Sequence, residues 1–339
     1  MFETTNQQPN SNDTSAQGVS VKEIPNQVIH ESFNSNNLSV NIAGVKLKNP
    51  VIAASGTFGN GSGYSSIFKI SQLGGICTKG LTMVPRTGNT GNRICETPGG
   101  LLNSIGLENS GIPAFIEKDL PVLREAGPVI IANLSGGESS EYVKGAVLLD
   151  ESSVDMIELN ISCPNVKVGG MAFGLDPGTA AALVSAVRRV CKRKPLMVKL
   201  SPNAPSLSAV ALACVNSGAD ALSLVNTFRA MSIDIVNRKP VFENIIAGLS
   251  GPAIKPIALR MVWELFDTLK DSNAMVPIVG IGGISCVYDA LEYLMAGAVA
   301  VQVGSATFSN PHAMVEIIGG LRQYMTDNKI STVSEISIR

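Results

Sequence analysis

The strongest constraint on the fold of this 339-residue chain is a repeated alternation of short apolar segments with longer amphipathic ones. Continuous apolar runs of this length predict strands buried on both faces, and helix-length segments between them predict a parallel sheet covered by helices. The predicted strands are 51–55, 75–79, 129–133, 156–160, 196–200, 221–226, 278–281 and 300–303. The predicted helices are 111–126, 139–150, 177–193, 205–217, 253–270, 287–296 and 311–327.

Eight strand–helix units in one chain match an α/β fold of the (β/α)8 TIM-barrel type in number and size. An open doubly wound sheet is the alternative, but its G-x-G-x-x-G turn is absent after the first strand, where the chain reads Ser55-Gly-Thr-Phe-Gly59. A β-hairpin over 38–47, with Gly44 at its turn, is expected to close the bottom of the barrel. We therefore predict one catalytic domain over 38–339.

The first 37 residues have a different composition, rich in Asn, Gln, Ser and Thr and without hydrophobic periodicity. Such a segment buries too little apolar surface to offset its ordering entropy, so we predict a disordered tail.

Composition excludes several classes of function. A formal net charge of −1 and a pI near 6.2 give no electrostatic basis for binding nucleic acid. No apolar run approaches the ~18 residues that span a membrane, and the first residues lack a signal-peptide pattern. The six cysteines are scattered without a C-x-x-C pair, which predicts reduced thiols, a cytoplasmic location and no metal or iron–sulfur site in this chain.

The segment Asp155–Asn165 begins as an apolar strand and ends as a polar loop in which Cys163 lies between Ser162 and Pro164. Proline disfavours the helical region for the preceding residue, which predicts an extended Cys163. The only histidines, His30 and His312, fall at no predicted strand end, so a base here is either Cys163 or a carboxylate, and this loop contains no Asp or Glu. A thiol with a pKa of ~8.5 needs only a modest downward shift to act as a general base.

Polar residues recur where the predicted strands end, and in barrels of this type the carboxyl ends of the strands build the active site. The glycine turns after the last two strands lie where such barrels commonly hold a phosphate group. The strand-end residues are Ser55, Lys79, Asn133, Asn160, Lys199, Asn226, Thr227, Gly282, Gly283, Gly304 and Ser305.

The chain resembles the dihydroorotate dehydrogenases over about 38–325. Cysteine at the position of Cys163 resembles the soluble classes of that family, and the Gly-Leu-Ser-Gly-Pro-Ala run at 248–253 is most similar to the catalytic subunit of the NAD-linked class. The matching motifs are 54–59, 78–82, 85–89, 96–109, 160–165 and 248–256.

The resemblance implies an enzyme of pyrimidine biosynthesis that oxidises dihydroorotate to orotate. Cys163 would remove the C5 proton and FMN would accept the C6 hydride, with Lys199 stabilising the charge on the reduced flavin. The implied FMN ligands are Ser55, Lys79, Gly80, Asn133, Asn160, Lys199, Val225, Gly251, Gly282, Gly283, Gly304 and Ser305. The implied substrate ligands are Lys79, Asn103, Ser104, Ile105, Gly106, Leu107, Asn160, Asn165, Asn226 and Thr227.

The same resemblance implies a homodimer of catalytic subunits with a second subunit that carries FAD and an iron–sulfur cluster and passes electrons to NAD. Fumarate or another oxidant is an alternative acceptor. Alternative functions are a dihydropyrimidine or dihydrouracil flavin oxidoreductase, an aldolase with a Schiff base on Lys199, and a flavin-carrying or scaffolding subunit whose chemistry resides in a partner.

Overall fold

The computed structural model describes residues 37–59, 61–162 and 172–339. The predicted tail, apart from its last residue, therefore lies outside the described residues, as do Cys163 and Asn165.

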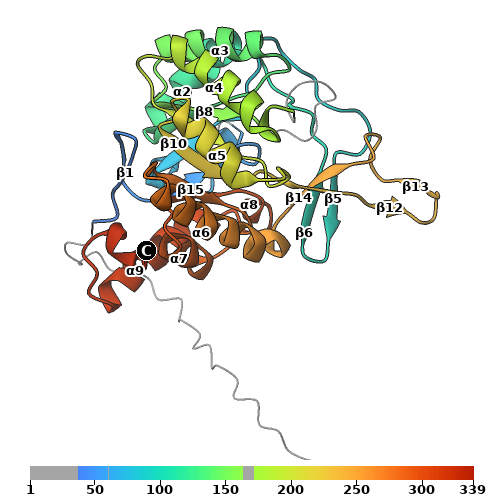
Figure 1. The fold of residues 1–339 in the computed structure, drawn as a ribbon. Helices are drawn as coiled ribbons and strands as arrows, with labels where there is room; N and C mark the ends of the chain where they lie inside the picture. The colour runs from blue at the N-terminus through green and yellow to red at the C-terminus, as the bar shows by residue number, and fades with distance from the viewer. Residues whose placement is uncertain (1–36, 60, 163–171) are drawn as a thin grey trace, which may run out of the picture. The chain divides into compact units, whose positions relative to one another are not determined.

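Eight parallel strands form a closed barrel, which confirms the predicted fold class (Figure 1). Each strand pairs with the next one predicted from the sequence, and the last pairs with the first through Val301 and Val51. The barrel strands in chain order are β3 (Val51–Ala53), β4 (Gly75–Cys77), β7 (Val129–Leu134), β8 (Met156–Asn160), β9 (Leu196–Lys199), β10 (Ala221–Leu224), β15 (Ile278–Ile281) and β16 (Ala300–Val303).

Helices follow the strands at the predicted places and pack on the barrel through one apolar face. In α6, the buried residues Ala258, Val262, Leu265 and Leu269 recur every three or four positions, which places them on a single side of the helix. The helices are α1 (Ile112–Ala114), a π-helical turn (Phe115–Asp119), α2 (Leu120–Ala126), α3 (Ser139–Glu151), α4 (Pro177–Val190), α5 (Leu207–Asn216), α6 (Lys255–Asp271), α7 (Val287–Met295), α8 (Ala306–Ser309) and α9 (Ala313–Asp327). Short 3-10 turns occupy Ser62–Tyr64, Ile70–Gln72, Ala172–Gly174, Pro252–Ile254 and Val333–Ile336.

The predicted N-terminal hairpin is present as β1 (Val40–Ile42) and β2 (Val45–Leu47). Its two turn residues, Ala43 and Gly44, have φ of 49° and 90°, the left-handed region that a tight two-residue hairpin requires. Ile42 and Leu47 are fully buried and pack on the apolar side chains inside the barrel. The hairpin therefore closes one end of the barrel, as predicted.

The barrel interior changes from apolar to polar along the strands. Ile131, Met156 and Met197 belong to the buried cluster that the hairpin covers. Successive side chains alternate across a strand, so residues two positions further on face the same interior. Those residues are Asn133, Glu158 and Lys199, all buried. The interior is thus hydrophobic beside the hairpin and polar toward the carboxyl ends of the strands.

A four-stranded antiparallel sheet, which the sequence did not lead us to expect, lies apart from the barrel (Figure 1). Its order is β11 (Phe228–Ala230), β14 (Ala247–Ser250), β6 (Gly100–Asn103) and β5 (Ile94–Thr97). A small hairpin, β12 (Ile233–Asp234) with β13 (Lys239–Pro240), extends from it. The pairing of Gly248 with Asn103 brings together two segments that are far apart in the sequence.

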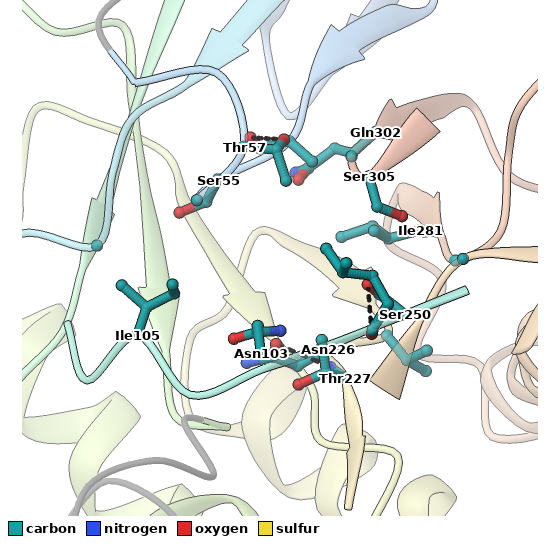
Figure 2. A pocket seen from close by; sticks show the side chains of 18 of the residues that line it. Ser55, Thr57, Asn103, Ile105, Asn226, Thr227, Ser250, Ile281, Gln302 and Ser305 are labelled. Atoms are coloured by element: carbon teal, nitrogen blue, oxygen red, sulfur yellow. Dashed lines mark hydrogen bonds between the residues drawn. The ribbon is translucent and has the colours of Figure 1, made fainter. Parts of the chain in front are cut away.

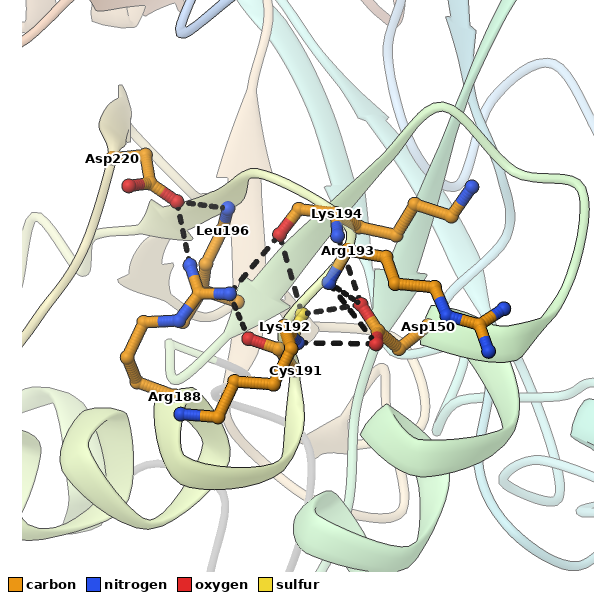
Figure 3. Close-up of polar contacts among 8 residues, drawn as sticks. All are labelled: Asp150, Arg188, Cys191, Lys192, Arg193, Lys194, Leu196 and Asp220. Carbon is orange, nitrogen blue, oxygen red and sulfur yellow. Dashed lines mark hydrogen bonds and ion pairs between the residues drawn. The ribbon is translucent and has the colours of Figure 1, made fainter.

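A run of basic residues over 188–194, at the end of α4, is organised by two acidic residues (Figure 3). The carboxylate of Asp150, at the end of α3, accepts hydrogen bonds from the backbone N–H groups of Lys192, Arg193 and Lys194 at 2.8–3.2 Å. Arg188 forms an ion pair with Asp220 at 2.7 Å. The helix ends at Val190, three residues before the predicted end. Arg188 and the backbone N–H groups of residues 192–194 hold the loop that leads into β9.

Candidate functional site

A cavity, partly open to solvent, lies at the carboxyl ends of the barrel strands. Figure 2 shows Asn103, Asn226 and Thr227 gathered on one side of it, with Gln302 and Ser305 on the other. The cavity is therefore built jointly by the barrel and by β6 of the additional sheet.

Most of the predicted site residues line this one cavity. Cys163 and Asn165 lie outside the described residues, so their placement stays a prediction. Asn133 and Ser104 are buried and do not line the cavity. The predicted residues in its wall are Ser55, Lys79, Gly80, Asn103, Ile105, Gly106, Leu107, Asn160, Lys199, Val225, Asn226, Thr227, Gly251, Gly282, Gly283, Gly304 and Ser305.

The charge of the cavity is positive. Lys79 and Lys199 contribute ammonium groups, and no Asp or Glu is among the described residues that line the wall. A cationic, partly enclosed cavity attracts anions, because charges interact more strongly where water is limited. The site is suited to an anionic ligand.

The amide side chains around the cavity are held in defined orientations. Asn103 Nδ2 donates to the Gly248 carbonyl at 3.2 Å, across the β6–β14 pairing. Asn226 Nδ2 donates to the Ser162 carbonyl at 3.1 Å, while its Oδ1 accepts from the Thr227 N–H at 2.8 Å. An amide has both donor and acceptor ends, so fixed amides can recognise a ring with C=O and N–H groups along its edge.

The sequence analysis missed a buried carboxylate beneath the cavity. Glu158 is fully buried on β8, and its oxygens accept from Asn133, Ser223, Gln302 and Cys77. Burial raises the pKa of Glu158, but the Lys199 charge and the hydrogen bonds outweigh burial and hold that pKa below its usual range. The available signal was a charged residue in an otherwise apolar strand, two positions before Asn160.

Two further polar residues of the cavity wall were not predicted from the sequence. Gln302, on β16, and Thr57, after β3, both line the cavity. The remaining unpredicted lining residues are mainly apolar: Ala54, Gly56, Ile94, Leu101, Ser250, Ile254, Ile281, Ile284 and Phe308. Apolar walls of this kind suit a planar ring.

Glycines follow β15 and β16 at the cavity wall. Gly283 has φ of 67°, and a Cβ built there would lie 2.7 Å from Lys255 Cβ and 2.9 Å from the Gly251 carbonyl oxygen. Gly251 itself has φ of 100°. Gly283 and Gly251 therefore require glycine because of their backbone conformation and their packing within the protein, and both line the cavity. Among the described residues no group of His, Cys, Asp and Glu is arranged to hold a metal ion.

The chain is thus a closed (β/α)8 barrel whose carboxyl face has a cationic, amide-lined cavity of the kind that suits an anionic small molecule. The chain belongs to the dihydroorotate dehydrogenase family, whose sequence model matches residues 37–325. It is 58% identical over 297 residues to the dihydroorotate dehydrogenase B (NAD(+)) catalytic subunit of Petrotoga mobilis, covering 88% of this chain and 97% of that protein. The subunit of the same name from Geotalea daltonii is 53% identical over 301 residues, covering 88% and 96%.

The family match confirms the resemblance seen in the sequence and makes the chain one of a family of oxidoreductases. Within the described part of the chain, no helix has the length and apolarity needed to cross a membrane.

Proposed function

We propose that the chain is the catalytic subunit of an NAD-linked dihydroorotate dehydrogenase that oxidises dihydroorotate to orotate in pyrimidine biosynthesis. The observation that carries this proposal is the cavity: two lysines and three asparagines converge on it without a lining carboxylate among the described residues. Dihydroorotate is a small cyclic anion with amide-like edges, which is what such a wall can recognise. The names of the relatives support the same reaction.

The residues present fit FMN. The phosphate would be held by Gly282, Gly283, Gly304 and Ser305, where the backbone leaves no room for a side chain at Gly283. The ring and ribityl chain would lie along the wall that contains Ser55, Gly80, Asn160, Lys199 and Val225, with Gly251 near the phosphate. Bound FMN would supply the two-electron acceptor for the reaction.

The protein's own residues would bind the substrate and move its proton. Lys79 supplies a positive charge for the carboxylate, and Asn103, Asn160, Asn226 and Thr227 supply hydrogen bonds to the ring. Ile105, Gly106 and Leu107 would close over it from the loop after β6. Cys163 would take the proton from C5, Asn165 would help to hold the substrate, and Lys199 would offset the negative charge that develops during reduction.

The relatives are named catalytic subunits, which supports a partner subunit in the working enzyme. We propose that this partner carries FAD and an iron–sulfur cluster, that it transfers electrons to NAD in the cytoplasm, and that two catalytic subunits pair within the complex.

The purified protein tests the proposal directly. It should be yellow, release FMN on denaturation, and lose its visible absorbance when dihydroorotate is added without oxygen. Orotate should perturb the flavin spectrum and uracil should not, because only orotate carries the carboxylate that Lys79 would bind. A colourless protein indifferent to FMN would refute the proposal, and a response to uracil alone would favour the dihydropyrimidine oxidoreductase.

Cys163→Ser tests the base. A serine hydroxyl loses its proton far less readily than a thiol, so we expect flavin reduction at pH 7 to slow by about 10²–10⁴-fold and to recover as pH rises. The matched control is Cys286→Ser, because Cys286 is exposed and caps α7 outside the cavity. Unchanged reduction at pH 7 in Cys163→Ser would remove that thiol from the base role.

A further inference from the structure

The centre of the barrel contains a carboxylate that no step of the proposed reaction uses. Glu158 Oε1 accepts from Ser223 Oγ at 2.8 Å and Gln302 Nε2 at 2.7 Å. Its Oε2 accepts from Asn133 Nδ2 at 2.5 Å and Cys77 Sγ at 3.0 Å. Side chains of four other strands thus donate hydrogen bonds to this one carboxylate. Hydrogen bonds of this kind are stronger when the acceptor is ionised, so the four donors favour a charged Glu158.

One of these donors begins a relay toward the cavity. Asn133 Nδ2 donates a hydrogen bond to Glu158, and Asn133 Oδ1 accepts one from Asn160 Nδ2 at 3.2 Å. Asn160 Oδ1 in turn accepts from the backbone N–H of Ser162 at 3.2 Å and from the Ser162 hydroxyl at 3.0 Å. The relay therefore runs from a group that can only donate, a backbone N–H, to a group that can only accept, an ionised carboxylate.

The direction of this relay decides what Asn160 presents to a ligand. The two ends of an amide have nearly the same shape, so a rotated amide would exchange donor and acceptor at the cavity wall. The relay ends in a pure donor, the Ser162 N–H, and a pure acceptor, the Glu158 carboxylate. If the amide of Asn133 or Asn160 were rotated by 180°, two donors or two acceptors would therefore face each other. A buried group left without a partner costs free energy that the present arrangement avoids.

Glu158 and Lys199 are both buried and lie on the neighbouring strands β8 and β9. Lys199 is 5% exposed, and its charge acts on both Glu158 and Cys77. A buried ammonium without a nearby anion is costly, and the Glu158 carboxylate on the adjacent strand offsets part of that cost. Burial raises the pKa of Cys77, and the Glu158 charge raises it further, which leaves Glu158 as the anion of this group.

We propose that Glu158 is a positioning residue for the ligand site: it is the final acceptor of the relay that orients Asn160, and it places a buried negative charge on the strand next to Lys199. This inference rests on the proposed function, because Asn160 is a proposed ligand of both cofactor and substrate and Lys199 is a proposed ligand of the cofactor. It also explains why Asn133, a predicted FMN ligand, is buried behind the wall: Asn133 transmits the orientation from Glu158 to Asn160.

Two variants separate positioning from packing. Glu158→Gln keeps the size of the side chain but removes its charge and turns an NH2 group toward the donors Asn133 and Cys77. Adding Asn133→Asp to it restores a carboxylate one residue along the relay. The introduced glutamine would then donate to the introduced aspartate, and that aspartate would accept from Asn160. The remaining oxygen of the glutamine would still accept from Ser223 and Gln302.

The first measurement is FMN binding to apoprotein, followed by quenching of flavin fluorescence, and the second is orotate binding to the holoenzyme, followed by the flavin spectrum. Hydrogen bonds to charged groups contribute about 1.5–3 kcal/mol each, so E158Q should weaken both affinities by about 10–100-fold. The double variant N133D/E158Q should regain at least about tenfold of that loss. Asp150→Asn, which removes a buried carboxylate at the end of α3, should lower stability and leave both affinities unchanged.

The outcomes are distinct. Unchanged FMN and orotate affinities in E158Q, or a loss that N133D/E158Q fails to recover, would overturn the proposal. If E158Q does not fold but N133D/E158Q folds and binds FMN, the rescue supports it; if neither folds, Glu158 is a structural residue and the proposal fails. Because FMN affinity needs no turnover, wild-type protein that binds FMN without being reduced by dihydroorotate refutes the substrate assignment alone.

Discussion

Asp150→Asn is the perturbation whose effect on stability can be worked out most fully. The Asp150 side chain is 5% exposed and stands at the end of α3, opposite the loop 191–195 that enters β9 (Figure 3). Oδ1 accepts from the N–H groups of Lys194 at 2.8 Å and Arg193 at 2.9 Å, and Oδ2 accepts from Lys192 at 3.0 Å. Both oxygens are therefore used by backbone donors that have no freedom to turn away.

Asparagine has one oxygen, so its NH2 group must face at least one of these N–H groups. A buried donor left without an acceptor costs about 1–3 kcal/mol, and loss of the charge weakens the remaining hydrogen bonds. Together these effects should lower the free energy of unfolding of D150N by about 2–4 kcal/mol. With an unfolding entropy of about 2.1 cal/mol/K per residue over roughly 300 residues, the midpoint of thermal unfolding should fall by about 3–6 °C.

The pH dependence of this difference follows from the pKa of Asp150. Burial raises that pKa, but the backbone hydrogen bonds from Lys192, Lys194 and Arg193 lower it more, and the net value lies below the usual one. A carboxyl group whose pKa is lowered by folding stabilises the protein fully above its unfolded pKa, near ~3.9, and loses that contribution as pH falls through the folded pKa. The stability difference between wild type and D150N should therefore be constant from pH 7 to about pH 5 and shrink below about pH 4.

The assay is thermal unfolding of the apoprotein, followed by circular dichroism at several pH values. Asp234→Asn is the matched control, since Asp234 also accepts backbone N–H groups, from Val236 and Asn237, but in an exposed turn where water can replace them. Equal midpoints for wild type and D150N at pH 7, or a difference that grows as pH falls, would refute the reasoning.

Two further predictions concern burial. Ile42→Ala should destabilise the protein by about 2–5 kcal/mol, because Ile42 is fully buried in the hairpin that closes the barrel. FMN affinity should stay within about twofold of wild type. Urea unfolding measures the stability and flavin titration measures the affinity. Cys77, Cys191 and Cys214 should resist thiol reagents at pH 8 in the native protein, because burial raises the pKa of each, to about 12 for Cys191 and Cys214. Exposed Cys286 should react at once, and rapid labelling of the three buried thiols, read by mass spectrometry of peptides, would contradict the structure.

The barrel could be predicted because its strands are buried on both faces and therefore appear as apolar runs in the sequence. The additional sheet could not, because its strands are only partly buried and carry no such run. In β5, the residues Ile94–Thr97 alternate between exposed and half-buried positions. Their partners lie far along the chain, as the pairing of Gly248 with Asn103 shows, and no local pattern indicates a pairing at that separation.

The site residues that could be predicted from the sequence are those that lie at the carboxyl ends of strands. Lys79, Asn160, Lys199 and Asn226 were identified because they end predicted strands, and the structure brings all four to one cavity. Glu158 follows a different rule: its importance comes from the closure of the barrel, which directs side chains of β4, β7, β10 and β16 at it. The residue that ends a strand can be predicted from the sequence of that strand alone. The partners of a residue inside the barrel are known only once the strands have been placed in register around it. For that reason the role of Glu158 could not be inferred from the sequence alone.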